Sequence, residues 1–296
     1  MRRDASSMRV LVTGGCGFLG AAFARRARDA GHTVVTLDRD AAADIHADVA
    51  DPNAMADAFA QAAPHAVVHL AAWLTDASAD DPVGATRVNA LGTATIFAAA
   101  ESIGAARVIH ASSNAAVGRC APAAGDDVAL DPQTVYGATK AFGEHLARAM
   151  SRRDGAPGYL ALRFGWVYGP GRARGWAAPQ RVIAEAIAGV DTVHYPDYER
   201  AIDWTYVDDA AEMLVRALEC PLERFAVHNA MGDRRTMRDA VAHLRTRFPR
   251  LDARPYAATL PDSAWDLRND GLAARIGTVP LTTLESGIDR MIAEIR

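Results

Sequence analysis

Hydrophobic and polar positions follow two different periods along the first half of the chain. Short apolar runs rich in β-branched residues predict strands at 8–14, 32–38, 65–72, 106–113 and 159–165. Between these runs, apolar residues recur at helical spacing at 18–31, 51–62, 81–104 and 135–152. Strands that are apolar on both faces and alternate with helices indicate a parallel sheet covered by helices on both sides. We therefore expect an α/β fold built on a doubly wound, Rossmann-type parallel sheet.

The regular alternation ends after Phe164. A loop rich in Gly, Pro and Trp follows, and shorter elements fill the rest of the chain. Such a change of pattern predicts a second, smaller unit beside the sheet. We expect a Rossmann domain at 1–165, to which 203–227 return, and a C-terminal substrate-binding cap made of 166–202 and 228–296.

The composition is that of an ordinary soluble globular protein, with 50% hydrophobic and 23% charged residues. The 32 basic and 36 acidic residues give a net charge of −4, and no basic block is longer than a pair. We therefore expect no nucleic-acid partner. Neither a secretory signal nor an apolar run of about 18 residues is visible. These features predict a cytoplasmic protein with no membrane partner.

Three cysteines, Cys16, Cys120 and Cys220, are far apart in the sequence and odd in number. This pattern favours a reducing compartment over a disulfide framework. A zinc site needs clustered ligands, so we also expect no metal.

Gly15, Gly17 and Gly20 fit the pattern G-x-G-x-x-G between a predicted strand and a predicted helix. Glycines at this spacing allow a tight turn and a close approach to a pyrophosphate, which faces the helix N-terminus. Asp38 ends the second strand, where a carboxylate binds the adenosine ribose and repels a 2′-phosphate. The pattern predicts NAD rather than NADP, although Arg39 is a residue that can accommodate the phosphate.

Tyr136 and Lys140 are four residues apart and so share one face of a predicted helix. A nearby ammonium favours phenolate, so we expect the pKa of Tyr136 to fall toward the range of a general base. Lys140 is also the only lysine in the chain. Ser112 and Ser113 end the preceding strand, where one hydroxyl can hold the reacting oxygen while the other satisfies the backbone.

Several longer motifs together resemble one protein family. They are TGGCGFLG (13–20), HLAA (69–72), VNALGT (88–93), ASSNAAVG (111–118), YGATK (136–140), LRFGWVYGPG (162–171), WTYVDDAAE (204–212) and LESGIDRMI (284–292). In this order they resemble the extended short-chain dehydrogenase/reductase family, which includes the NAD-dependent sugar epimerases and dehydratases. The resemblance covers nearly the whole chain.

The resemblance implies that Tyr136 is the catalytic acid and base, that Lys140 is its partner, and that Ser113 is the catalytic serine. It also implies a homodimer formed through the helices at 81–104 and 135–152. The residues expected to bind NAD are Gly14, Gly17, Phe18, Leu19, Gly20, Asp38, Arg39, Asp48, Val49, Leu70, Ala71, Ala72, Asn89, Tyr136 and Lys140.

The sequence departs from the family pattern where the substrate class is decided. The 4,6-dehydratases carry Thr-Asp-Glu where this chain has Ser113-Asn114-Ala115, so we do not expect dehydration. Nucleotide-sugar members have an asparagine at the position of Trp166 and an arginine at the position of Ile202. The tyrosine usual at the position of Val117 is also missing. These apolar replacements weaken a nucleotide-sugar assignment.

We predict an NAD-dependent oxidoreductase that interconverts a secondary alcohol and a ketone or lactone on a small polyol or sugar-derived substrate. The alternatives are a sugar epimerase with no net redox change and a non-catalytic NAD-sensing protein, which needs neither Tyr136 nor Lys140. Arg172 and Arg174 either clamp a small carboxylate or are surface arginines of an arginine-rich chain. The residues expected to contact the substrate are Ser112, Trp166, Arg172 and Arg174.

Overall fold

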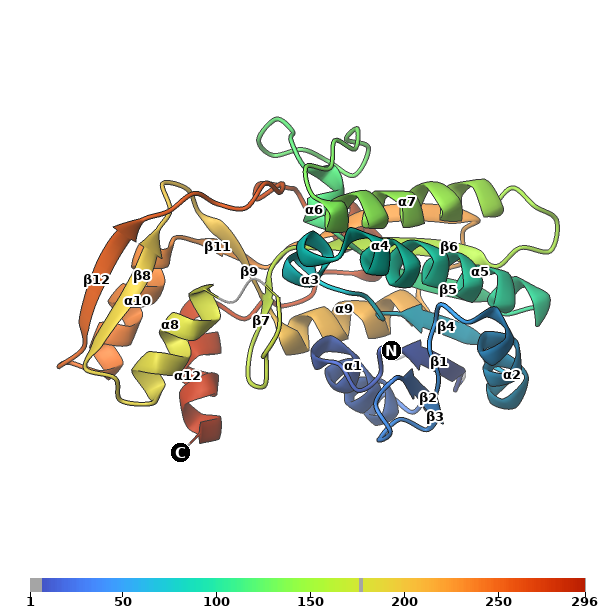
Figure 1. Ribbon diagram of the computed structural model, residues 1–296, viewed down its shortest axis with the longest axis horizontal. Helices are drawn as coiled ribbons and strands as arrows, with labels where there is room; N and C mark the ends of the chain where they lie inside the picture. The colour runs from blue at the N-terminus through green and yellow to red at the C-terminus, as the bar shows by residue number, and fades with distance from the viewer. Residues whose placement is uncertain (1–6, 176–177, 296) are drawn as a thin grey trace.

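The computed structural model describes residues 7–175 and 178–295, and a seven-stranded parallel sheet lies at its centre (Figure 1). The strand order is β10-β6-β5-β4-β1-β2-β3, and every neighbouring pair is parallel. The predicted Rossmann-type fold class is confirmed. The strands are β1 (Arg9–Thr13), β2 (Thr33–Asp38), β3 (Ile45–His46), β4 (Ala66–His69), β5 (Arg107–Ser113), β6 (Gly158–Phe164) and β10 (Phe225–Ala230).

Helices cover both faces of this sheet because its strands are apolar on both sides. Val10 and Val12 of β1 pack in the cluster that contains α1 and α9, whereas Leu11 packs in the cluster of the opposite face. The alternation follows from the two-residue period of a strand. On the first face lie α1 (Phe18–Asp29) and α9 (Val207–Glu219), and on the second lie α2 (Pro52–Ala62), α5 (Gly92–Ser102) and α7 (Val135–Met150).

The single helix predicted over 81–104 is wrong in detail. The segment consists of α4 (Pro82–Ala85), a π-helical turn (Thr86–Leu91) and then α5, and a short helix that was not predicted, α3 (Thr75–Asp80), precedes it. A π-helical turn holds one more residue per turn than an α-helix, and its hydrogen bonds cannot be read from apolar spacing. This turn carries the buried Asn89.

Parts of the second half of the chain form a cap that contains two small sheets (Figure 1). The segment expected to return to the large sheet at 203–227 is divided, because 203–206 belong to β9 of a small sheet while α9 and β10 belong to the large one. The cap strands are β7 (Val167–Tyr168), β8 (Thr192–Asp197), β9 (Ile202–Tyr206), β11 (Asp233–Arg235) and β12 (Asp252–Ala257). The other helices are α6 (Asn114–Val117), α8 (Ala178–Ile187), α10 (Met237–Arg247), α11 (Asp270–Ile276) and α12 (Leu284–Ile295).

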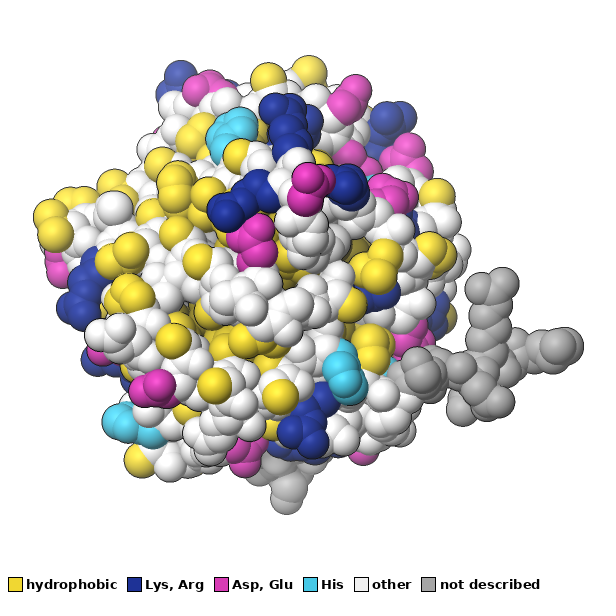
Figure 2. All heavy atoms as spheres, turned by 90° about the vertical axis from the view of Figure 1, so that its right-hand side faces the viewer, with side chains coloured by type: hydrophobic (Ala, Val, Ile, Leu, Met, Phe, Trp, Pro, Cys, Tyr) yellow, Lys and Arg dark blue, Asp and Glu magenta, His cyan; other side chains and the backbone are white. Residues whose placement is uncertain are grey.

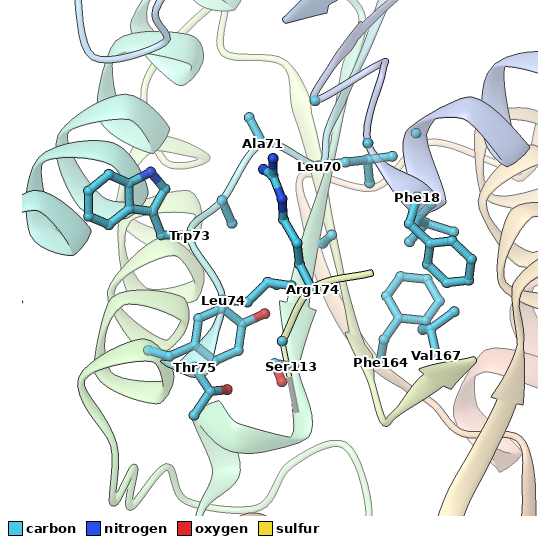
Figure 3. Close-up of a pocket in the computed structure, with 18 of the residues that line it drawn as sticks. Phe18, Leu70, Ala71, Trp73, Leu74, Thr75, Ser113, Phe164, Val167 and Arg174 are labelled. Atoms are coloured by element: carbon cyan, nitrogen blue, oxygen red, sulfur yellow. The ribbon is translucent and has the colours of Figure 1, made fainter. Parts of the chain in front are cut away.

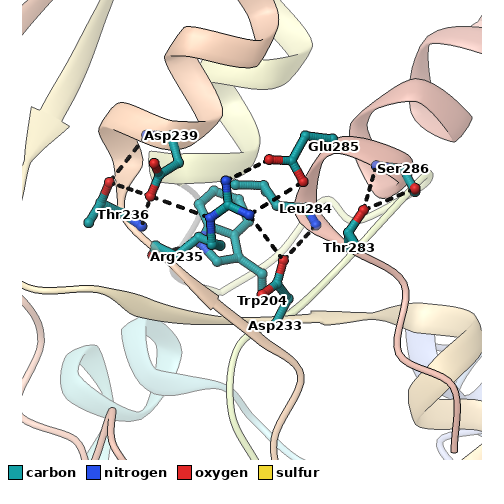
Figure 4. A network of polar contacts seen from close by, with 9 residues as sticks. All are labelled: Trp204, Asp233, Arg235, Thr236, Asp239, Thr283, Leu284, Glu285 and Ser286. Atoms are coloured by element: carbon teal, nitrogen blue, oxygen red, sulfur yellow. Dashed lines mark hydrogen bonds and ion pairs between the residues drawn. The ribbon is translucent and has the colours of Figure 1, made fainter.

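Arg235 joins the three-stranded sheet β11-β9-β7 to the helices of the cap (Figure 4). Its guanidinium lies 2.6 Å from a carboxylate oxygen of Glu285 on α12 and 3.5 Å from one of Asp239 on α10. The indole N–H of Trp204 on β9 donates to the Arg235 carbonyl at 3.0 Å. These contacts connect β9, β11, α10 and α12, so the cap is cross-linked by polar contacts as well as by its apolar core.

Figure 2 shows the face of the molecule that lies at the right-hand side of Figure 1, away from the cap. Basic, acidic and apolar side chains are interspersed on this face, so neither sign of charge dominates it. Within 7–175 and 178–295, no helix has the length and apolar character that crossing a membrane requires.

Candidate active site

A cavity of about 820 Å³ lies at the carboxyl ends of the strands of the large sheet, between the sheet and the cap. Ligands of open α/β sheets bind at this edge. The predicted site residues that line the cavity are Gly14, Gly17, Phe18, Leu19, Gly20, Asp38, Arg39, Asp48, Val49, Leu70, Ala71, Ala72, Ser112, Ser113, Tyr136, Lys140, Trp166, Arg172 and Arg174. Among the predicted residues, Asn89 is the exception.

The glycine-rich turn between β1 and α1 forms one end of the cavity. Gly14 has a φ of +70°, and a Cβ there would lie 2.7 Å from the backbone nitrogen of Ala71. A Cβ on Gly20 would lie 2.0 Å from the Gly14 carbonyl oxygen. No side chain caps the N-terminus of α1 at Gly17, so the N–H groups of its first turn remain as donors. The turn therefore fits the pyrophosphate of a dinucleotide.

Asp38 occupies the end of β2 beside this turn. Its carboxylate accepts backbone N–H groups from Cys16 at 3.0 Å, Arg39 at 2.7 Å and Asp40 at 3.2 Å. These contacts fix a negative charge in the cavity wall, where it suits ribose hydroxyls and opposes a 2′-phosphate. The residues present therefore fit NAD.

Ser113, Tyr136 and Lys140 meet at the other end of the cavity. The Lys140 ammonium donates to the Ala111 carbonyl at 2.7 Å and lies 5.6 Å from the centre of the Tyr136 ring. The Ser113 hydroxyl, at the end of β5, donates to the Asn114 side-chain oxygen at 3.2 Å, and its presence beside Tyr136 favours the phenolate form. The backbone N–H of Ala115 also donates to the Ser113 Oγ at 3.2 Å, which orients the hydroxyl.

The expected fall in the pKa of Tyr136 is wrong for the protein without cofactor. Burial raises the pKa of the phenol to about 12, while the Ser113 hydroxyl and the Arg172 guanidinium act in the opposite direction. Burial also lowers the pKa of the Lys140 ammonium to about 8. The sequence argument considered the neighbouring charge and omitted the desolvation, which is the larger effect here.

Ser112 lies in the cavity wall, and its hydroxyl proton is engaged with the protein. The hydroxyl donates to Glu144 on α7 at 2.6 Å. The same carboxylate accepts two hydrogen bonds from Arg163, at 2.9 and 2.8 Å. Ser112 is therefore bonded to the buried framework behind the site, and its contact with the substrate stays a prediction.

Asn89 also serves the framework rather than the cavity. Its side-chain oxygen accepts the Trp73 N–H at 2.7 Å, and its NH₂ group donates to the Trp73 carbonyl at 2.9 Å and to the Thr139 hydroxyl at 3.1 Å. These contacts fix the loop after β4, which forms one wall of the site. Asn89, which the resemblance places at the cofactor, is not among the residues that line the cavity.

Arg172 and Arg174 follow β7 and line the same cavity. Arg172 is half-buried, and its Cζ lies 5.5 Å from the centre of the Trp166 ring and 5.9 Å from that of Phe18. Arg174 is exposed, and Figure 3 shows its side chain lying across the pocket with the guanidinium directed toward Ala71. The two arginines therefore present positive charge to the cavity from the cap side.

Besides neighbours of the predicted residues, the cavity is lined by two segments in which the sequence predicted no site residue. The first belongs to the loop and helix after β4, and the rule that ligands bind at the carboxyl ends of strands was a signal for it. The second comes from the irregular segment after β12, and nothing in its sequence pattern indicated a site. The residues concerned are Trp73, Leu74, Thr75, Asp76, Pro261, Ser263 and Trp265.

Comparisons with known proteins agree with this geometry. The model of the NAD dependent epimerase/dehydratase family matches residues 10–227. UDP-glucose 4-epimerase of Mycolicibacterium smegmatis (strain ATCC 700084 / mc(2)155) is 32% identical over 231 residues, which are 71% of this chain and 73% of that protein. The 2-alkyl-3-oxoalkanoate reductase of Stenotrophomonas maltophilia (strain K279a) is 30% identical over 270 residues, 83% and 78% of the two chains.

A solved structure extends the likeness to nearly the whole chain. MoeE5 in complex with UDP-glucuronic acid and NAD has a TM-score of 0.84 and 28% sequence identity to this chain, with 97% of this chain and 98% of that chain covered. The resemblance to extended short-chain dehydrogenases/reductases is confirmed. The chain is an NAD-dependent enzyme and belongs to the NAD-dependent epimerase/dehydratase family.

Proposed function

We propose that the enzyme is an NAD-dependent oxidoreductase that interconverts a secondary alcohol and a ketone or lactone on a small polyol or sugar-derived substrate. The observation that carries the proposal is that Ser113, Tyr136 and Lys140 line the same cavity as the glycine-rich turn, with the Lys140 ammonium 5.6 Å from the centre of the Tyr136 ring. One cavity thus brings a proton-transfer pair and a dinucleotide site together.

Each of these residues has a role that follows from its geometry. Ser113 holds the substrate oxygen, and Tyr136 takes up the hydroxyl proton in oxidation and returns it in reduction. The Lys140 ammonium beside the ring favours the phenolate form, and its hydrogen bond to Ala111 fixes its position. When bound, NAD supplies the hydride acceptor. Substrate orientation between Ser113 and Tyr136 supplies the rest of the rate acceleration.

The substrate side of the cavity favours a small molecule over a nucleotide sugar. Trp166 packs 5.7 Å from Tyr168 and 5.0 Å from Trp204, measured between ring centres, and only 4% of its surface is exposed. Ile202 is fully buried. Buried apolar side chains, Trp166 and Ile202, thus occupy the two positions at which nucleotide-sugar relatives are expected to have polar groups. The name of the Stenotrophomonas relative, an oxoalkanoate reductase, supports net redox chemistry in the family.

A sugar epimerase is the second candidate, and the observation that favours it is the 32% identity to a UDP-glucose 4-epimerase. In that case the hydride would be removed and returned to the opposite face of the same carbon, with no net redox change. The proposed roles of Ser113, Tyr136 and Lys140 would be the same in both candidates.

We further propose that 1–165, with α9 and β10, form the NAD-binding domain and that the cap binds the substrate. A homodimer through α5 and α7 is part of the proposal, since Leu91 beside α5 and Phe142 on α7 are 47% and 42% exposed. A cytoplasmic location is proposed because Cys16, Cys120 and Cys220 are all free thiols.

Nucleotide retained by the purified protein tests the proposal without knowledge of the substrate. The protein is denatured by heat, and the released NAD, NADH and their phosphorylated forms are quantified per subunit. An oxidoreductase must exchange its cofactor in every cycle, so we expect a largely empty protein that binds added NAD reversibly. Near-stoichiometric retained NAD would instead favour the epimerase, whose cofactor is regenerated in each turnover.

A further inference from the structure

Arg172 is a guanidinium in the catalytic cavity that has no carboxylate partner. Among the residues that the structure describes, no Asp or Glu oxygen lies within 4.0 Å of it, and Asp76 is the acidic group that influences it from a greater distance. Its Nη1 donates to the Val167 carbonyl at 2.5 Å, while its Nε is buried without a hydrogen-bond partner. A buried polar atom of this kind calls for an explanation.

Arg163, a buried arginine outside the cavity, has the carboxylate partner that Arg172 lacks. Its side chain is 3% exposed, and Glu144 neutralises it with two hydrogen bonds of 2.9 and 2.8 Å. Removing a charge from water costs several kcal/mol, and a close counter-charge offsets that cost. For Arg172 the protein supplies aromatic rings and one carbonyl instead. An anion brought into the cavity would complete its environment.

The position of Arg172 assigns this anion to the substrate. The guanidinium contacts Trp166, on the substrate side of the cavity, and it interacts electrostatically with the catalytic Tyr136. The cofactor pyrophosphate already has the glycine-rich turn and the N-terminus of α1. We infer that the substrate is a hydroxy acid whose carboxylate is bound by Arg172 close to the reacting hydroxyl; this inference rests on the proposed oxidoreductase function and narrows it.

The surrounding charges favour a monoanion. Asp76 also lines the cavity, and its carboxylate opposes a second negative charge on the substrate. A planar carboxylate can accept two hydrogen bonds from the fork of a guanidinium. A phosphate dianion can do the same, but its second negative charge would be repelled more strongly by Asp76. In the reaction the carbinol C–H electron pair and its hydrogen pass to NAD, and the O–H proton passes to Tyr136. The products are an oxo acid, or a lactone from a cyclic hemiacetal, together with NADH and one proton.

The test compares hydroxy acids with neutral alcohols of the same skeleton. NADH formation is measured with gluconate, glucuronate and glycerate and with glucitol, glucose and glycerol, for the wild-type enzyme, for Arg172→Gln and for Arg172→Lys. Arg250→Gln, at an exposed arginine outside the cavity, is the matched control. The Kd of NAD is measured for every variant, and thermal unfolding verifies that each is folded.

We expect the wild-type enzyme to prefer one of the acids over its neutral counterpart. Arg172→Gln should lower kcat/KM for that acid by about 10- to 100-fold, the effect of losing a charge-assisted hydrogen bond, and should leave the Kd of NAD within about threefold. Arg172→Lys keeps the charge without the fork, so its loss should be smaller. Arg250→Gln should behave as wild type.

Two results would overturn the inference and leave the proposed function standing. If neutral alcohols are oxidised as well as the acids, and Arg172→Gln is as active as the wild type, the substrate needs no carboxylate bound by Arg172. A weaker affinity for NAD in Arg172→Gln, with unchanged preference for the acid, would assign the guanidinium to the cofactor. If no compound forms NADH, the proposed function fails. In that case thermal unfolding of the NAD complex is measured with and without the hydroxy acids. A hydroxy acid that raises the unfolding temperature of the wild type but not of Arg172→Gln would support the carboxylate site. If no acid stabilises either protein, the carboxylate site is overturned.

Discussion

The Lys140 ammonium lies 5.6 Å from the centre of the Tyr136 ring, one turn further along α7. Its hydrogen bond to the Ala111 carbonyl fixes it against β5, and the side chain is almost completely buried. A planar guanidinium is larger and presents its donors in a different geometry. This explains why a chain that otherwise uses arginine for its positive charges has a lysine at this position.

We therefore predict that Lys140→Arg does not preserve activity although it preserves charge. The kcat of NADH formation should fall by at least about 100-fold, the usual contribution of a positioned proton-transfer group. Steady-state kinetics and thermal unfolding should be measured together with Arg181→Lys, an exposed arginine on α8, as the control. A Lys140→Arg enzyme with wild-type kcat would show that any cation suffices beside Tyr136.

The pH dependence of the two reaction directions should differ. With a pKa of about 12, Tyr136 stays protonated as the acid for reduction, whereas Lys140, with a pKa of about 8, loses its charge first. The kcat of ketone reduction should be constant below about pH 8 and fall above it, because uncharged Lys140 no longer stabilises the phenolate left when Tyr136 gives up its proton. Oxidation needs the phenolate, so its kcat should rise with pH up to about 8. A reductive rate that increases above pH 8 would contradict these assignments.

The buried pair Arg163 and Glu144 should be a major contributor to stability. Glu144→Gln leaves the Arg163 charge buried at 3% exposure without a counter-charge and replaces one of the two acceptor oxygens by an NH₂ donor. Breaking such a pair from one side costs about 3–5 kcal/mol of unfolding free energy. Glu185→Gln, in the exposed pair with Arg181, should cost less than about 1 kcal/mol. Urea unfolding of both variants tests the contrast, and equal losses would argue against it.

Asp38 should control the choice of cofactor. Asp38→Asn removes the negative charge that faces the ribose, so the Kd of NAD should rise about 10- to 100-fold while the Kd of NADP changes less. Asp57→Asn, on the exposed face of α2, should leave both constants unchanged. Fluorescence titration with the two cofactors measures the effect. If the preference for NAD survives in Asp38→Asn, the shape of the pocket rather than the charge of Asp38 must supply it.

The cofactor half of the site could be predicted because its signals are local in sequence. Gly20 is needed where the start of α1 approaches the Gly14 carbonyl oxygen six residues earlier, and Asp38 ends the next strand. The proton-transfer half was found from the spacing of Tyr136 and Lys140. Its electrostatics were not, since the pKa of Tyr136 depends on burial that only the folded protein supplies.

Side-chain direction accounts for what the sequence left undecided. Ser112 and Ser113 are adjacent on β5, and the sequence could not decide which hydroxyl donates to the buried Glu144 and which to Asn114 in the cavity wall. Asn89 is turned inward by a π-helical segment that has no apolar signature. Trp265 reaches the cavity from a part of the chain more than 100 residues after Tyr136, and only tertiary packing brings them together.

The stoichiometry of NADH formation separates net oxidation from epimerisation most directly. With a substrate identified from the panel of acids and alcohols, NADH and all carbon products are quantified over a full time course with excess NAD. The assignment of an oxidoreductase predicts about one NADH and one oxidised product for each substrate molecule consumed. Complete conversion of the substrate to a stereoisomer, with no accumulated NADH, would contradict it.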